Sequence, residues 1–146
     1  MKTVIRNTIY IIEALLFILW ILFCKLLGIN YASSIGGQLA KFFGQFTILD
    51  KRATNNLKKV FPQANKAKLT QIRLGMWENL GRTLAELAFA NKLNPYKNKG
   101  INSYKNKPRF LITGEKYIDD LNNDNKGAIL FSAHIGNWEI CPLITT

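Results

Sequence analysis

Residues 9–27 read IYIIEALLFILWILFCKLL, an apolar run of nineteen residues whose only charges, Glu13 and Lys25, lie near its ends. A helix of about 20 apolar residues matches the roughly 30 Å hydrocarbon core of a bilayer. Charged side chains near the ends of such a helix can reach the membrane interface. We therefore predict an N-terminal membrane anchor over residues 1–30.

A cleaved signal peptide is the alternative, because Lys2 and Arg6 precede the apolar run. The run is longer than the roughly 7 to 15 residues usual in such peptides, and Asn30-Tyr31-Ala32 is a poor cleavage site. We favour an uncleaved anchor that either spans the membrane or lies in its interface. Basic residues on both sides of the run leave its orientation open.

Composition and charge limit the remaining classes of protein. The chain of 146 residues is 48% hydrophobic and 20% charged, which excludes a mainly disordered or fibrous protein. Two cysteines are too few for a disulfide framework and lack zinc-type spacing, so we expect reduced thiols and no bound metal.

The net charge of +11 is concentrated in residues 31–110, which carry a net +12, whereas residues 111–146 carry a net −3. A basic segment beside a membrane anchor attracts anionic lipid or an acidic protein, although it can also be a solvated surface without a partner. No recognition motif for nucleic acid accompanies the charge, so we do not expect nucleic acid as a partner.

Residues 31–109 form a segment that we predict to be helical and basic. Ser33 and Ser34 offer an N-cap for one amphipathic helix, and a second helix covers about residues 47–60, ended by Phe61-Pro62. A third helix begins near Asn65. It carries apolar residues at steps of three and four that predict a core-facing stripe: Leu69, Ile72, Met76, Leu80, Leu84 and Leu87. A loop then covers residues 91–109.

Residues 110–146 predict an α/β fold with parallel strands. The apolar runs 110–112 and 128–133 are typical of short buried strands, and a helical pattern over residues 115–121 lies between them. Two strands do not make a stable parallel sheet. We therefore expect only the start of a β-α-β core here, with the rest either in a second fragment that completes the domain or in a longer gene product of which this chain is a part.

The segment Ser132–Ile140, SAHIGNWEI, follows the second of these runs and contains the only histidine of the chain. His134 and Glu139 are five residues apart, a spacing that places them on different faces of a helix or a strand. They can meet only at a junction between strand and helix, where Gly136 would permit the sharp turn.

If these side chains meet, a neutral imidazole can accept a proton from an attacking hydroxyl while the carboxylate fixes its tautomer. Ser132 and Cys141 have no independent support as nucleophiles. A histidine and a glutamate at this spacing are also compatible with purely structural roles.

Three segments carry a resemblance to a known family. The string HIGNWE (residues 134–139) resembles the H-x-x-x-x-E motif of the lipid A biosynthesis lauroyl/myristoyl (late) acyltransferases. Residues 52–57 with Phe61-Pro62 are similar to that family's R-x-x-x-N-L and F-P segment. Residues 78–86 resemble its N-x-G-R-x-x-x-E segment, and an N-terminal membrane anchor is also typical of the family.

The resemblance implies an enzyme of the inner membrane with its active site on the cytoplasmic side. It would transfer an acyl chain from acyl carrier protein to a hydroxyl of the Kdo-lipid A precursor, with His134 as general base and Glu139 as its orienting partner. It would use no cofactor. Because the resemblance covers only the N-terminal half of the family's length, we expect the chain to be inactive or incomplete by itself.

Two other functions stay open at the level of sequence. A glycerolipid or lysophospholipid acyltransferase has a similar motif, although it more often ends in aspartate and lacks the N-x-G-R segment. A non-catalytic, membrane-anchored remnant that binds anionic lipid through its basic surface is the second alternative.

Overall fold

The computed structural model describes residues 2–93, 103–104, 107–108, 111–133 and 135–144. These residues fall into two compact units, Met1–Ala88, here called the helical unit, and Phe89–Thr146, here called the C-terminal unit. Each unit is described by itself.

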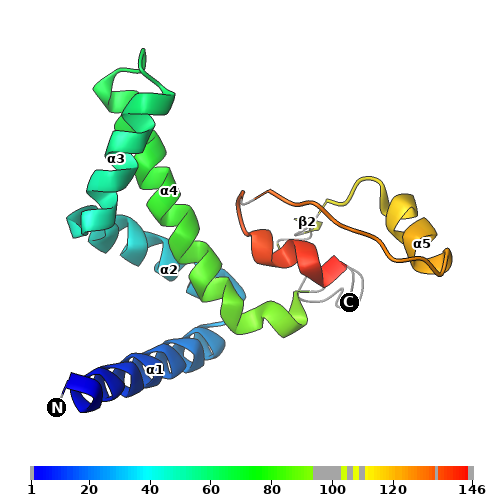
Figure 1. Cartoon of the computed structure of the whole chain (residues 1–146), viewed down its shortest axis with the longest axis horizontal. Coiled ribbons are helices and arrows are strands. Elements are labelled where there is room, and N and C mark those ends of the chain that lie inside the picture. Colours follow the sequence, from blue (N-terminus) through cyan, green and yellow to red (C-terminus); the bar gives the residue numbers. More distant parts are fainter. Residues whose placement is uncertain (1, 94–102, 105–106, 109–110, 134, 145–146) are drawn as a thin grey trace. The chain divides into compact units, whose positions relative to one another are not determined.

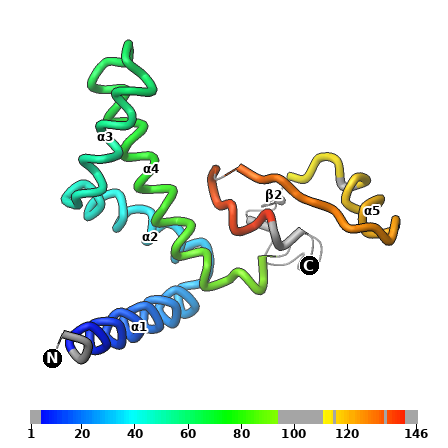
Figure 2. Tube along the Cα trace, in the orientation of Figure 1, coloured from blue at the N-terminus to red at the C-terminus, as the bar shows by residue number. Residues whose placement is uncertain are grey.

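The helical unit contains four α-helices, α1 (Lys2–Leu27), α2 (Ile29–Phe43), α3 (Ile48–Val60) and α4 (Lys66–Glu86). A short 3-10 turn, η1 (Gly44–Phe46), joins α2 to α3, and a second, η2 (Leu87–Lys92), follows α4. Helix α4 packs against both α2 and α3, and α2 also contacts α1 (Figure 1). The trace in Figure 2 shows α3 and α4 as a hairpin of neighbouring helices.

Helix α1 contains the apolar run that predicts the anchor. Its stretch Ile5–Leu27, of 23 residues with a mean hydropathy of 2.3, is long and apolar enough to cross a membrane. Most of its large apolar side chains are exposed, as a bilayer-facing helix requires. Gly28 separates α1 from α2 with a φ of 74°, a left-handed conformation that glycine adopts without steric cost.

The start of α2 differs from the prediction. We expected Ser33 or Ser34 to cap this helix, but α2 begins at Ile29, directly after Gly28. Both serines therefore lie inside the helix. The change of direction comes from the positive φ of Gly28, which ends α1 and lets the next helix begin at once.

The predicted bounds of α3 and α4 are confirmed. Helix α3 ends at Val60, immediately before Phe61-Pro62. Asn65 caps α4, since its Oδ1 accepts a hydrogen bond of 2.9 Å from the backbone N–H of Lys68.

The most deeply buried face of α4 is not the predicted leucine stripe, four of whose six residues are half-buried. The buried residues of α4 are Trp77, Gly81, Thr83 and Ala85, whereas Met76 and Leu84 of the stripe are about 40% exposed, at 39% and 42%. Gly81 and Ala85 on this face are small, which lets α2 approach α4 closely. A Cβ added to Gly36 of α2 would lie 2.6 Å from the carbonyl oxygen of Gly81 and 2.8 Å from the Cβ of Ala85.

The structure of the C-terminal unit differs from the predicted α/β fold. Its described strands, β1 (Ser103–Tyr104) and β2 (Lys107–Pro108), have two residues each and pair antiparallel, with Ser103 opposite Pro108. The predicted helix is confirmed as α5 (Glu115–Asn123), and a 3-10 helix, η3, covers Trp138–Ile144.

The predicted parallel β-α-β core is wrong for the described residues. Residues 111–112 and 128–133 form no regular secondary structure, and Leu111, Ile129 and Phe131 are 91%, 82% and 94% exposed. The physical reason is that a parallel strand needs partners in a larger sheet and helices on both faces. Two short apolar runs supply neither, so their backbone forms no parallel ladder.

Candidate functional site

Polar side chains along the contact between α2 and α4 come largely from the segment that resembles N-x-G-R-x-x-x-E. Ser33 Oγ on α2 donates a hydrogen bond of 2.7 Å to Glu86 Oε1 on α4. About two turns away on each helix, Lys41 Nζ lies 3.0 Å from Glu78 Oε2. Since the pairs 33–86 and 41–78 run in opposite directions along the chain, α2 and α4 are antiparallel.

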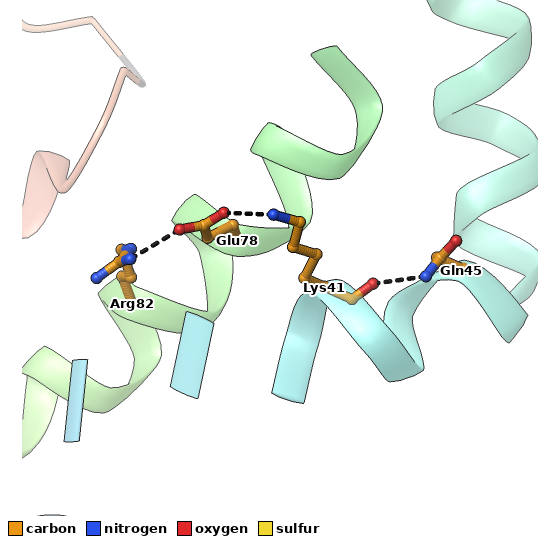
Figure 3. Close-up of polar contacts among 4 residues, drawn as sticks. All are labelled: Lys41, Gln45, Glu78 and Arg82. Atoms are coloured by element: carbon orange, nitrogen blue, oxygen red, sulfur yellow. Dashed lines mark hydrogen bonds and ion pairs between the residues drawn. The ribbon is translucent and has the colours of Figure 1, made fainter. Parts of the chain in front are cut away.

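Glu78 lies between two cations (Figure 3). Its Oε1 accepts a hydrogen bond of 2.7 Å from Arg82 Nη2, and its Oε2 accepts one from Lys41. The Arg82 bond first, and then the Lys41 bond, lower the pKa of the Glu78 carboxyl. The four-residue pair from Glu78 to Arg82 that the sequence predicts is therefore confirmed. Gln45 Nε2 donates to the carbonyl oxygen of Lys41, 2.9 Å away.

A second polar cluster joins α3 to α4. Asp50, in the first turn of α3, is only 5% exposed. Its Oδ1 accepts a hydrogen bond of 2.7 Å from Trp77 Nε1, and its Oδ2 forms an ion pair with Arg73. The paired carboxylate is satisfied at both oxygens, as a buried charge must be. The same Trp77 ring lies against Gly44, where an added Cβ would be 2.7 Å from Cε2.

Sequence reasoning missed Ser33, Asp50 and Trp77 as members of these clusters. A pattern could have indicated the helix contact itself, because Gly36 and Ala40 on α2, and Gly81 and Ala85 on α4, repeat small residues at a spacing of four. Such spacings permit close approach of two helix backbones. The polar partners across the contact have no comparable sequence pattern.

The predicted catalytic segment lies in the C-terminal unit. His134 lies outside the described residues, so its distance from Glu139 remains a prediction. Glu139 is exposed and lies in the first turn of η3. Gly136 has a φ of 61°, so the bend expected there is present. The backbone N–H of Ile135 donates to the carbonyl oxygen of Ala133 at 2.8 Å, which tightens the chain just before this bend.

Ser132 and Cys141, for which the sequence gives no independent support as nucleophiles, are both exposed in the structure. Ser132 precedes the bend, and Cys141 is a free thiol within η3. Exposure alone gives neither a base nor an electropositive neighbour, which an activated nucleophile needs. The segment therefore offers one carboxylate on a short helix, directly after a glycine bend and an apolar stretch.

The helical unit also contains a cavity of about 390 Å³ between α3 and α4. Its lining residues come from both helices and include three cations: Thr54, Leu57, Lys58, Lys66, Leu69, Thr70 and Arg73.

Comparison with known protein families shows which family the chain belongs to. The model of the bacterial lipid A biosynthesis acyltransferase family matches residues 1–145, and the chain belongs to this family. No curated protein and no solved structure matches the chain. This match confirms the family that the H-x-x-x-x-E resemblance predicts. The family consists of acyltransferases, so the chain belongs to this class of enzyme.

Proposed function

We propose that the chain supplies the anchor and the catalytic motif for the transfer of a fatty acyl chain from acyl carrier protein to a hydroxyl of the Kdo-lipid A precursor. The observation that carries this proposal is the family match over residues 1–145, which includes the HIGNWE string. We assign the enzyme to the inner membrane, with α1 as the anchor and the motif on the cytoplasmic side.

In the proposed reaction, His134 accepts the proton of the acceptor hydroxyl as that oxygen attacks the thioester carbonyl carbon. The carbon–sulfur bond then breaks, and the imidazolium returns the proton to the departing thiolate. An ester and a free thiol are formed. Glu139 holds the imidazole in the required tautomer and stabilises its charged form. No protein nucleophile and no cofactor is needed, since the hydroxyl comes from the substrate.

Two features of the described chain support this assignment. The positive φ of Gly136 provides a bend between positions 134 and 139, which neither a continuous helix nor a continuous strand would provide. The exposure of Glu139 leaves its carboxylate accessible to a neighbouring imidazole and to substrate.

The test is acylation of lipid A in a strain that lacks late acylation. The chain is expressed alone and together with a segment that supplies the C-terminal half of the family's domain, and lipid A is analysed by mass spectrometry. We expect one added acyl chain from at least one of these two arrangements. In membranes with labelled acyl carrier protein, His134→Ala should lower the rate by a factor of about 10² to 10⁴, which is what a general base contributes.

Cys141→Ser is the matched control, because this exposed thiol lies in η3, as Glu139 does, and has no assigned role. It should leave the rate unchanged. Activity that survives His134→Ala would refute the general-base assignment. Acylation of a lysophospholipid in place of the lipid A precursor would favour a glycerolipid acyltransferase, and no transfer in either arrangement would favour a non-catalytic remnant.

A further inference from the structure

The cavity between α3 and α4 lies in the half of the helical hairpin nearest the connection between these two helices. Thr54, Leu57 and Lys58 come from α3, and the other four lining residues come from α4. All seven belong to the helical unit, so the cavity depends on no residue of the HIGNWE segment.

The charged side chains that line this cavity are all cationic. Residues 51–77 contain seven Lys or Arg residues and no Asp or Glu. Three of these cations, Lys58, Lys66 and Arg73, line the cavity, and its seven lining residues include no carboxylate. Arg73 forms an ion pair with the buried Asp50, which fixes the guanidinium and balances its charge, so Lys58 and Lys66 supply the free positive charge. Lys58 and Lys66 are exposed, so their ammonium groups are accessible to an anion.

The remaining lining combines hydroxyl and apolar groups. Thr54 and Thr70 can donate hydrogen bonds to anionic oxygen atoms. Leu57 and Leu69 are half-buried and provide apolar surface beside them. Cations and hydroxyls bind phosphate oxygens well, whereas the leucines would gain nothing from a small hydrated ion. The combination fits an anion that is carried on an apolar chain.

We propose that this cavity binds the phosphate-ester headgroup of a lipid, with Lys58 and Lys66 contacting the phosphate and Leu57 and Leu69 contacting the adjoining acyl or glycerol carbons. For a membrane phospholipid this function goes beyond acyl transfer, because it requires binding only; for a phosphorylated glycolipid it rests on the proposed function, and binding is measured here without any acyl transfer. The headgroup can belong to a membrane phospholipid or to a phosphorylated glycolipid, which share this chemistry. A volume of about 390 Å³ suits a headgroup better than the surface of an acidic protein.

The test uses the full chain in micelles of an uncharged maltoside detergent. Dioleoylphosphatidic acid, a bisphosphorylated glucosamine disaccharide lipid and inorganic phosphate are titrated separately by calorimetry. The double variant Lys58→Gln/Lys66→Gln removes two cavity cations. The matched control is Lys59→Gln/Lys68→Gln, which removes the same charge from exposed neighbouring positions that do not line the cavity.

We expect the cavity variant to raise the dissociation constant for the lipid phosphate about tenfold or more, which is the loss of one charge-assisted hydrogen bond or more. The control should change it by about twofold, because exposed charges at a distance are screened. Helical circular dichroism should be unchanged in both variants, since all four lysines are exposed.

The lipid that binds more tightly identifies the source of the headgroup, and either result supports the site. Equal losses in the two variants would overturn the proposal, because binding would then reflect diffuse charge. Inorganic phosphate that binds as tightly as the lipids would also overturn it, since the leucines would contribute nothing. Specific loss of acidic carrier protein binding in the cavity variant, with lipid binding unaffected, would assign the cavity to a protein partner instead.

Discussion

Substitution of Gly36 by alanine should separate α2 from α4. The new Cβ would lie 2.6 Å from the carbonyl oxygen of Gly81 and 2.8 Å from the Cβ of Ala85. Ordinary contacts of such atoms lie at roughly 3.4 Å or more, so the two helices must move apart by about 0.8 Å at this point. Overpacking of this kind costs about 1–3 kcal/mol, and we expect the upper end because the facing oxygen belongs to the backbone.

Part of this cost is offset, because alanine favours a helix over glycine by about 1 kcal/mol. Gly36→Ala should therefore lower the free energy of unfolding by about 2 kcal/mol. The matched control is Gly75→Ala in α4, where an added Cβ would have no neighbour within 4 Å. That variant should gain about 1 kcal/mol from helix propensity alone.

The assay is thermal unfolding in detergent, followed by circular dichroism at helical wavelengths. We expect the midpoint to fall for Gly36→Ala and to rise for Gly75→Ala. The opposite signs make the comparison decisive, because a general effect of losing a glycine would move both variants in the same direction. A Gly36→Ala protein as stable as the parent chain would refute the close contact between α2 and α4.

Three further predictions concern the same unit. Ser33→Ala removes the hydrogen bond to the partly buried carboxylate of Glu86 and should lower the free energy of unfolding in denaturant by about 1.5–3 kcal/mol. Ser34→Ala, at the adjacent exposed position, should lower it by less than about 0.5 kcal/mol. Equal losses would contradict the assigned hydrogen bond. Because the pKa of Glu78 is lowered by its two cations, its stabilisation is fully present above the ordinary glutamate pKa and is lost as the pH falls through the lowered value. An acid titration of the unfolding midpoint should therefore fall less steeply in Glu78→Gln than in the parent chain, and identical profiles would contradict this contribution. If Ile5–Leu27 spans the membrane, the chain should stay in the membrane pellet after carbonate or high-salt extraction, whereas release would indicate a peripheral helix.

The sequence predicts the helices of this chain well where local rules decide them. Phe61-Pro62 ends α3 because proline disfavours a helical residue before it, and Asn65 begins α4 because its side chain caps the first turn. The same reasoning failed at Ser33, whose side chain bonds across to α4 instead of capping α2. A capping residue is recognised from its neighbours in sequence, whereas its partner here is 53 positions away.

The failures share a physical cause, since they depend on groups that are distant in sequence. Leucine periodicity predicts an apolar face on α4, but the backbone approach at Gly36 and Gly81 decides which face packs against α2. Likewise, the apolar run 128–133 has a strand-like composition, yet a strand exists only where a neighbouring strand pairs with it. For the candidate site, the bend at Gly136 could be predicted, because only its local geometry was required.

The contact at Gly36 also has a genetic consequence. A second-site change at the contact can relieve a clash only by shrinking the side chain that faces it, whereas a distant change can only offset its cost. Here Ala85→Gly would remove one obstacle, but the other is the carbonyl oxygen of Gly81, which every amino acid retains. A search for suppressors of Gly36→Ala that act at the contact itself should therefore recover mainly true revertants.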